Sequence, residues 1–412
     1  MAWLKKGVNQ KESKMDITDQ KIKDWGDLKL DDSTEWSLKK GWDLSYSSNA
    51  AIEKVSDIHT LWSLRSDWEE LSKKFELPLL EIDLFLAGTK AFSSSSTLEV
   101  ITLRKEKLIA AAPLALKGVI IPHLEILGSS ILREPGGFIY QDKKSLMLLI
   151  DVLLATHIPI YLRGIYQESL TAKLLNQKLQ EYDEGFYEME QFKIPYVDTK
   201  GDWESFMQGM SSGRRSNFRR LKRRVEERGR VEFKLVIPSI ENVDHYLKEV
   251  MDVEASNWKG RMGTAIKTHP TLHIFFREYA KYMAQKGKLR LFFMQVNGES
   301  IAVQFAVEHA DRLWIYKIGY DEKWGFCSPG KLLMHHVVQY CFESELDGCE
   351  FMGNNDRWLH IWASGVHDLV SYSIYPNTLK GKAARLQDKL TAKYHDAINN
   401  GKYKWQVSRK RG

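Results

Sequence analysis

The most highly charged segment of this sequence, Ser212 to Val231, combines nine Lys and Arg residues with two Glu. In a helix, Arg215, Arg219 and Arg223 would share one side. Like charges packed this closely repel one another, and Arg forms paired hydrogen bonds with phosphate. We therefore expect Arg215, Arg219 and Arg223 to bind a phosphate-rich partner. The alternative is a basic face that only water contacts.

Glu254 is a carboxylate on a helical face that is otherwise apolar, with Val243, Leu247 and Val250 before it and Trp258 after it. A carboxylate in such a place suits a general base that deprotonates an ammonium group. We predict that Glu254 is catalytic and that Trp258 contacts the substrate. A partly solvated Glu at the end of a helix is the alternative.

A third cluster belongs to the strand predicted at 313–318 and the residues after it. Strict alternation along this strand puts Tyr316 and Lys317 on opposite faces, with Lys317 among the less polar neighbours. Lys317 would anchor an anionic group of the substrate, Tyr320 would protonate a leaving group, and Asp321 would contact the substrate. Packing or a turn is the alternative role for each.

Ser328, Pro329, Gly330 and Lys331 open a helix, because Ser is a good N-cap and Pro suits the first helical position. The free N–H groups and partial positive charge of a helix N-terminus attract phosphate. We predict a phosphate site formed by Ser328, Gly330 and Lys331. An ordinary capped helix is the alternative.

These residues lie among elements that can position them. Asn297-Gly298 predicts a tight hairpin between strands at 289–296 and 301–307, and a third strand follows at 313–318. Earlier in the chain, strands and helices also alternate, which is typical of an α/β sheet. A hairpin around 104–107, short strands at 125–127 and 138–140, and helices at 61–75, 146–155 and 170–181 are predicted there.

This layout resembles the acyl-donor half of a GNAT-type acyltransferase, and more closely the FemAB-like branch, whose members are often called BioF2-like or CelD-like acetyltransferase domains. The resemblance covers Trp62 to Trp362 and rests on six motifs: Lys286-Gly287, Asn297-Gly298, Ile301-Ala302, Lys317, Tyr320-Asp321-Glu322 and Ser328-Pro329-Gly330. Their order and spacing are more specific for the fold than for the substrate.

The resemblance implies an α/β fold with mixed sheets and tandem GNAT-like domains, the first degenerate. The corresponding division is a flexible extension over 1–50, a degenerate domain over 51–193, an acyltransferase domain over 194–376 and a basic helical tail over 377–412. It also implies an N-acyltransferase that moves an acyl group from acyl-CoA to an amine acceptor without a metal. Glu254 would remove a proton, Tyr320 would supply one, and the backbone N–H groups of Ile301, Ala302 and Val303 would polarise the acyl carbonyl.

The sequence departs from the family pattern in the segment from Gly353 to Trp362. Allowing for one inserted residue, Trp358 stands where the family often has Tyr, and Leu359 stands where it often has Lys. If that Lys binds the acceptor, either the acceptor differs here or the activity is impaired. Asp356 and Trp358 are therefore candidate substrate contacts, and Arg357 and His360 are further substitutes for the Lys.

Two other functions remain open at this point. FemAB-like proteins include transferases that use aminoacyl-tRNA, and the basic segment at Arg214–Arg230 and the basic tail suit an RNA backbone, which would make binding strongly salt-dependent. The same surfaces suit anionic membrane lipids in a non-catalytic binding module. A catalytically silent protein would tolerate replacement of Glu254 but would lose binding without Arg219 and Arg223.

The 412-residue chain is long enough for two domains, and its net charge of +6 is small compared with its local charge clusters. Its three cysteines form no CxxC or Cys/His ligand pattern, which makes zinc binding unexpected and favours a reducing compartment. The N-terminal residues lack the apolar core of a signal peptide, and the most apolar run, 146–162, is too polar to span a bilayer. We expect a cytoplasmic protein that associates at most peripherally with membranes.

Overall fold

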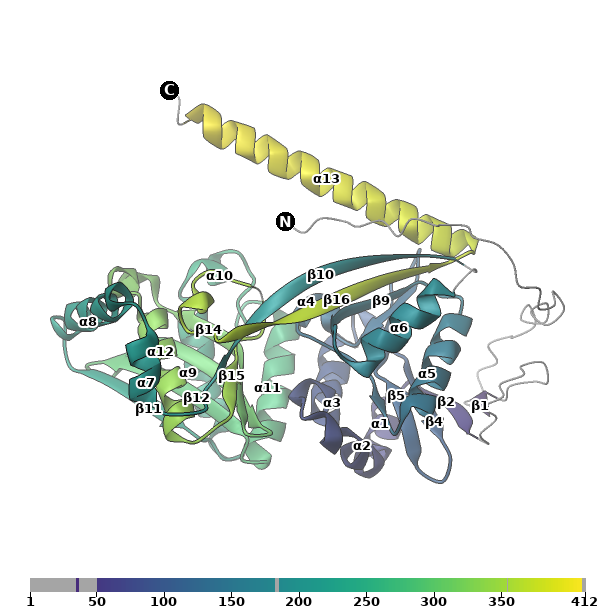
Figure 1. Ribbon diagram of the computed structural model, residues 1–412, viewed down its shortest axis with the longest axis horizontal. Coiled ribbons are helices and arrows are strands. Elements are labelled where there is room, and N and C mark those ends of the chain that lie inside the picture. Colours follow the sequence, from purple (N-terminus) through teal and green to yellow (C-terminus); the bar gives the residue numbers. More distant parts are fainter. Residues whose placement is uncertain (1–34, 37–49, 182–184, 354, 410–412) are drawn as a thin grey trace.

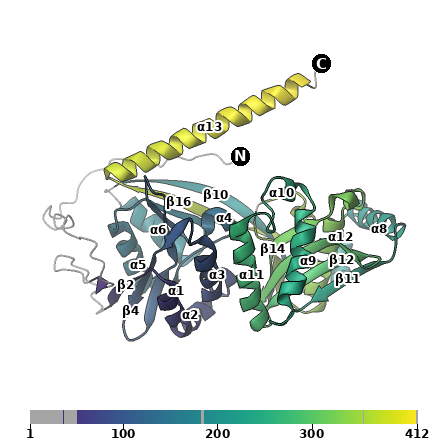
Figure 2. The same cartoon turned by 180° about the vertical axis from the view of Figure 1, so that it is seen from behind.

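The computed structural model describes residues 35–36, 50–181, 185–353 and 355–409 (Figure 1). The extension predicted over 1–50 lies outside these ranges except for three residues. Figure 2 shows the same fold from behind. The described residues form a mixed α/β structure with two sheets, as the sequence predicted.

The smaller sheet lies in the first half of the chain, and its strands all pair antiparallel. Its order is β1 (Glu35–Trp36), β2 (Ala51–Val55), β4 (Val100–Arg104), β5 (Leu108–Ala112) and β8 (Ile139–Tyr140). The helices of this half are α1 (Ile58–Ser63), α2 (Arg65–Ser72), η2 (Lys73–Phe75), η3 (Pro78–Leu80), α3 (Ile82–Phe92), α4 (Ser129–Leu132), α5 (Lys143–Ala155) and α6 (Leu170–Gln180). The predicted hairpin around 104–107 is confirmed by the pairing of β4 with β5.

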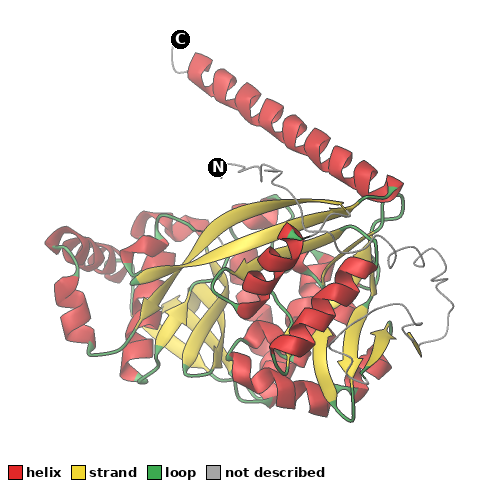
Figure 3. Ribbon diagram, turned by 45° about the vertical axis from the view of Figure 1, so that its right-hand side comes forward, coloured by secondary structure: helices red, strands yellow, loops and turns green. Residues whose placement is uncertain are grey.

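The larger sheet has 11 strands among the described residues and runs through both halves. In spatial order these are β11 (Val231–Val236), β12 (Leu289–Val296), β13 (Glu299–His309), β14 (Arg312–Tyr320), β15 (Gly348–Glu350), β10 (Gly185–Asp198), β16 (Gly365–Pro376), β9 (Ile160–Tyr166), β7 (His123–Ile126), β6 (Leu114–Lys117) and β3 (Ser96–Leu98). The long antiparallel ribbon of β10 and β16 joins the halves (Figure 3). The domain boundary predicted at 193–194 falls inside β10.

Helices cover the second half of this sheet on both faces. They are α7 (Trp203–Gly209), α8 (Ser212–Glu226), α9 (Val243–Ala255), α10 (Trp258–Arg261), α11 (Pro270–Gln285), η4 (Glu322–Cys327), α12 (Pro329–Glu343) and η5 (Leu359–Ile361). The last helix, α13 (Leu379–Arg409), instead begins beside β16 and β9 at the first half and projects from it. The apolar stripe of α9 packs with α11 on one face, which continues into the core of the first half. Helices α7, α8 and α12 pack on the other face. The two faces of β14 therefore border different cores.

Local sequence signals explain these elements. Asn297 and Gly298 have φ values of 51° and 85°, which the two-residue turn between β12 and β13 requires. Phe218, Leu221 and Val225 recur at helical spacing and bury one side of α8, although the rest of this helix is charged. The hairpin and the three strands predicted at 289–318 are confirmed.

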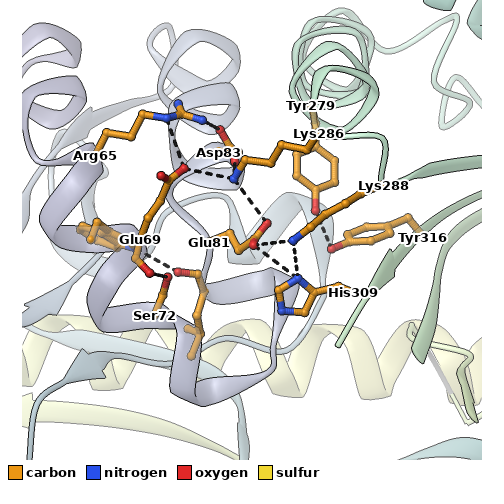
Figure 4. A network of polar contacts seen from close by, with 12 residues as sticks. Arg65, Glu69, Ser72, Glu81, Asp83, Tyr279, Lys286, Lys288, His309 and Tyr316 are labelled. Atoms are coloured by element: carbon orange, nitrogen blue, oxygen red, sulfur yellow. Dashed lines mark hydrogen bonds and ion pairs between the residues drawn. The ribbon is translucent and has the colours of Figure 1, made fainter. Parts of the chain in front are cut away.

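Charged side chains between the two halves form a network around Glu81 and Asp83 (Figure 4). The Lys288 ammonium lies 2.9 Å from the Glu81 carboxylate, and Lys286 contacts the carboxylates of Glu69 and Asp83. Burial raises the pKa of Glu81, but His309 and the two lysines outweigh burial and lower it to about 2. The Lys286-Gly287 motif thus belongs to a contact that fixes the second half against the first.

Candidate functional site

The central feature of the second half is the point where β14 and β15 separate. The two strands pair in parallel only at Arg312–Trp314, so β14 continues beyond its partner on that side. On its other side, Lys317 pairs with Phe305 and Ile315 pairs with Ala306, which leaves Tyr316 as an extra residue. This β-bulge reorients the strand where it becomes free.

The bulge corrects the predicted alternation of side chains along β14. Tyr316 and Lys317 both face α11, because the Tyr316 hydroxyl lies 3.0 Å from that of Tyr279 and the Lys317 ammonium lies 5.3 Å from the Phe276 ring. Tyr320 instead packs in the core on the α12 side. Lys317 and Tyr320 therefore lie on opposite faces of the sheet.

Glu254 lies on the same face as Lys317. Its side chain is almost fully buried at the end of α9, and one carboxylate oxygen accepts the Ile266 N–H at 2.9 Å. A Cβ atom on Gly319 would stand 2.5 Å from the Cα of Glu254. The glycine thus lets α9 approach β14 closely, and Glu254 adjoins the free part of the strand.

Glu134, which the sequence analysis did not identify, reaches this face from the first half of the chain. It follows α4, is buried, and accepts the N–H of Gly353 at 3.0 Å. Gly353 comes just after β15, and the charge of Lys317 on β14 acts on the same carboxylate. Glu134 therefore lies where β14 and β15 diverge.

The surroundings of Glu134 favour a carboxyl group that exchanges protons near neutral pH. Burial raises the pKa of Glu134 to about 7, and Lys317, the Gly353 N–H and Arg163 offset the burial only in part. Among the described residues, Arg163 Nε and the Tyr166 hydroxyl are buried without a hydrogen-bond partner. The charge of Glu134 helps to raise the pKa of Tyr166, although burial contributes most. Unpaired donors beside a titratable carboxyl group are suited to binding a polar substrate.

On the opposite face, the N-terminus of α12 adjoins the basic helix α8. Arg224 donates a hydrogen bond to the carbonyl of Phe326 at 3.3 Å, and the Arg228 guanidinium lies 5.4 Å from the Phe326 ring. Phe326 belongs to the turn just before Ser328. Ser328 is the N-cap residue, but its φ of 49° is left-handed and its side chain caps no N–H, so the predicted side-chain cap is wrong. Gly330 lies against the Tyr320 ring, and Lys331 is half-buried beside it.

The three arginines predicted to share a polyanion have different surroundings. Arg219 and Arg223 are exposed, and Arg223 makes only a long contact of 3.9 Å with Glu227. Arg215 is instead half-buried, and its Nη1 donates to the carbonyls at the end of α7. The Arg215 guanidinium thus links α7 to α8, and the substrate role predicted for Arg215 stays a prediction.

The carbonyl-polarising role predicted for Ile301, Ala302 and Val303 also stays a prediction. Strand β13 lies between β12 and β14, and both Ala302 and Val303 have partners on each side. Ile301 accepts the Asp321 N–H through its carbonyl. Strand β14, in contrast, is not paired with β15 beyond Trp314.

The remaining predicted residues are more dispersed. The Asp321 carboxylate accepts the N–H of Lys323 and caps the turn η4, and Asp356 is exposed. Trp358 is half-buried against Trp362 on the α8 side, with ring centroids 5.9 Å apart. Trp258 begins α10, but its side chain lies outside what the structure describes. Among the described residues, no three His, Cys, Asp or Glu side chains are placed to hold a metal ion.

Comparisons with known proteins agree with this geometry. Residues 212–359 match the family described as acetyltransferase (GNAT) domain. The crystal structure of FemX matches 81% of this chain and 99% of its own, with 12% identity and a TM-score of 0.50. The C-terminal domain of a putative lysylphosphatidylglycerol synthetase from Agrobacterium fabrum matches 80% of this chain and 96% of its own, with 8% identity and a TM-score of 0.49. A search of curated proteins found no match.

The family match and the separated central strands define the second half of the chain as a GNAT-type fold. More specifically, the second half of the chain contains a domain of the acetyltransferase (GNAT) family, and the fold as a whole is shared with FemX. The mixed α/β fold predicted from the sequence is thereby confirmed, and the family match covers only the second of the two predicted domains.

Proposed function

We propose that this protein is an N-acyltransferase that moves an acyl group from acyl-CoA to an amine acceptor. The observation that supports it best is the opening between β14 and β15 in a GNAT domain. Around this opening, a basic helix N-terminus lies on one face and a titratable carboxyl group lies on the other. A donor and an acceptor could then approach from opposite faces and meet between the strands.

The α12 face fits the phosphates of the donor. Gly330 and Lys331 in the first turn of α12 would bind the pyrophosphate, and Arg224 and Arg228 would add positive charge beside it. Acyl-CoA would supply an acyl group activated as a thioester. The free edge of β14 would align the acyl group, and Tyr320 would protonate the departing thiolate.

The opposite face fits the acceptor. Glu134 in its carboxylate form would take a proton from the ammonium group of the acceptor, which frees the nitrogen lone pair for attack. Lys317 would hold an anionic part of the same acceptor. Glu134 fits the role of base better than Glu254, because Arg163 and Tyr166 beside it have unpaired donors. Glu254 then serves to position β14.

Ligand-dependent thermal unfolding of the purified full chain tests this function. Acetyl-CoA, longer acyl-CoAs, free CoA and total tRNA are compared as ligands. A ligand at a hundred times its dissociation constant stabilises by about 2.7 kcal/mol, which raises the melting temperature by roughly 5 °C. We expect this increase with CoA or an acyl-CoA, and a smaller one in the Lys331→Gln variant.

The other outcomes separate the alternatives. Stabilisation by tRNA alone, lost at higher salt, would favour a transferase that uses aminoacyl-tRNA. No stabilisation by any of these ligands would favour a binding module without catalysis. Either result contradicts the proposed use of acyl-CoA.

A further inference from the structure

The C-terminal helix α13 has an exposed apolar face on the side opposite the one that packs on the other described residues. The opposite side of the helix packs on the sheet. Gly381 and Ala384 are buried there, and Asp388 accepts hydrogen bonds from the hydroxyls of Tyr161 and Tyr375 at 2.6 and 2.7 Å. These contacts fix the rotation of the helix about its axis. Because the rotation is fixed, helical periodicity determines which side of α13 each of its other residues occupies.

Five apolar side chains share the outward face. Leu379, Ala383, Leu386, Leu390 and Tyr394 are spaced by three or four residues, so they form one stripe. The two central leucines, Leu386 and Leu390, are 59% and 57% exposed, which is far more than a leucine that packs in a core. Helical periodicity places this stripe on the side of α13 opposite Gly381, Ala384 and Asp388.

Positive charge borders the apolar stripe. Lys380 lies on one flank and Lys382, Lys389 and Lys393 lie on the other, and all four are exposed. Among residues 379–394, whose side chains the structure describes, the one acidic residue of the helix is Asp388, and it lies on the buried side. An exposed apolar stripe flanked by lysines is the pattern of helices that lie in the surface of an anionic bilayer.

The loop between β6 and β7 adds apolar surface next to α13. Val119 and Ile120 at its tip are 99% and 89% exposed. This loop and the helix residues Ala384 and Gln387 line the same hollow, of about 670 Å³. The exposed apolar tip of the loop thus lies near α13, although the stripe of the helix points away from the hollow.

We propose that α13 docks on an anionic lipid bilayer, with its apolar stripe among the headgroups and upper acyl chains and its lysines on the lipid phosphates. A second copy of the chain fits less well, because pairing two stripes would bring the flanking lysines together. A nucleic acid would leave the leucines uncovered. No described helix is long and apolar enough to cross a membrane, so the contact would be peripheral. This inference does not depend on the proposed function.

Co-sedimentation of the full chain with vesicles tests the proposal. One set of vesicles contains phosphatidylcholine with phosphatidylglycerol, and the other contains phosphatidylcholine alone. We expect binding to the anionic vesicles that decreases with salt. The triple variant Leu386→Gln/Leu390→Gln/Tyr394→Gln should bind at least about tenfold more weakly, because its apolar stripe is lost. Its thermal unfolding should match that of the unaltered protein, since the three side chains are exposed.

A matched control separates the helix from general basicity. Arg219→Gln/Arg223→Gln removes two exposed charges from α8 and should leave vesicle binding unchanged. Equal binding by the stripe variant and the unaltered protein would overturn the proposal. So would a dimer in solution that dissociates in the stripe variant, because a second copy would then cover the stripe.

Discussion

At the scale of single residues, the acceptor side that we propose depends on the environment of Glu134. Its carboxyl group is buried, accepts a hydrogen bond from the Gly353 N–H and lies near the charge of Lys317. Because burial dominates, its pKa is about 7, which matches the pH at which a general base must exchange protons. Glu254, which the sequence favoured, accepts a backbone N–H and packs against Gly319.

We predict that Glu134→Gln lowers the rate of acyl transfer by about 10²- to 10⁴-fold, because the amide cannot accept the proton. In the unaltered protein the rate should rise as the pH passes through about 7, where Glu134 loses its proton. The variant should lose this dependence. Glu254→Gln is the comparison: if it removes the pH dependence and Glu134→Gln does not, the roles of the two residues are reversed.

At the scale of elements, the sequence predicted much of the GNAT half. Asn297-Gly298 and the alternating runs beside it predicted β12, β13 and β14, and Ser328-Pro329 predicted the start of α12. These features depend on residues close together in the chain. The bulge at Tyr316 was missed, because it depends on the register between β13 and β14. As a result, Lys317 was assigned to the wrong face.

Glu134 was missed for a related reason. It lies in a Gly- and Pro-rich loop without periodicity, and its partners Lys317 and Gly353 lie in the other half of the chain. The spacing of the Ile301-Ala302 motif also does not reveal that β13 is paired with a strand on each side. The basic segment at α8 was visible in the sequence, but Arg215 could not be recognised as a structural contact with α7.

The close approach of α9 to β14 leaves no room for a side chain at Gly319. A methyl group at this position would overlap the backbone of Glu254, which cannot move independently of α9. We predict that Gly319→Ala lowers the free energy of unfolding by about 1–3 kcal/mol, as overpacking does elsewhere. Chemical denaturation measures this. Gly325→Ala is the control, because no described atom lies within 4 Å of the place that its methyl group would take, and its effect should be small.

At the scale of the whole molecule, the two halves share one sheet and a network of buried charges. The ribbon of β10 and β16 carries the sheet across the chain, and the cluster at Glu81 links α3 and its neighbours to β12 and β13 (Figure 4). Both connections hold Glu134 of the first half against Lys317 of the second. The candidate site therefore combines residues of both halves, although the family match covers only residues 212–359.

The low pKa of Glu81 predicts how this connection responds to acid. Because the pKa is about 2 in the folded protein and about 4.5 when unfolded, the stabilisation is present above pH 4.5 and is lost as the pH falls toward 2. Glu81→Gln should lower the free energy of unfolding by roughly 2–4 kcal/mol at pH 7. The difference from the unaltered protein should shrink as the pH falls below 4.5.

Glu278→Gln provides the control for this experiment. It removes a contact between the halves with Lys90, whose side chain is 46% exposed. Exposed pairs of this kind contribute about 0–1 kcal/mol. An equal effect of the two substitutions at pH 7, or a Glu81 effect that does not change with acid, would contradict the assigned role of the network.

The central claim is acyl transfer from acyl-CoA at the opening between β14 and β15. The most direct test measures the release of free CoA thiol from acetyl-CoA and longer acyl-CoAs in the presence of a panel of primary amines. We predict release that depends on an amine, that yields the corresponding amide, and that falls at least about a hundredfold in Glu134→Gln. If no acyl-CoA supports release with any amine, while charged tRNA does donate its aminoacyl group, the account is contradicted.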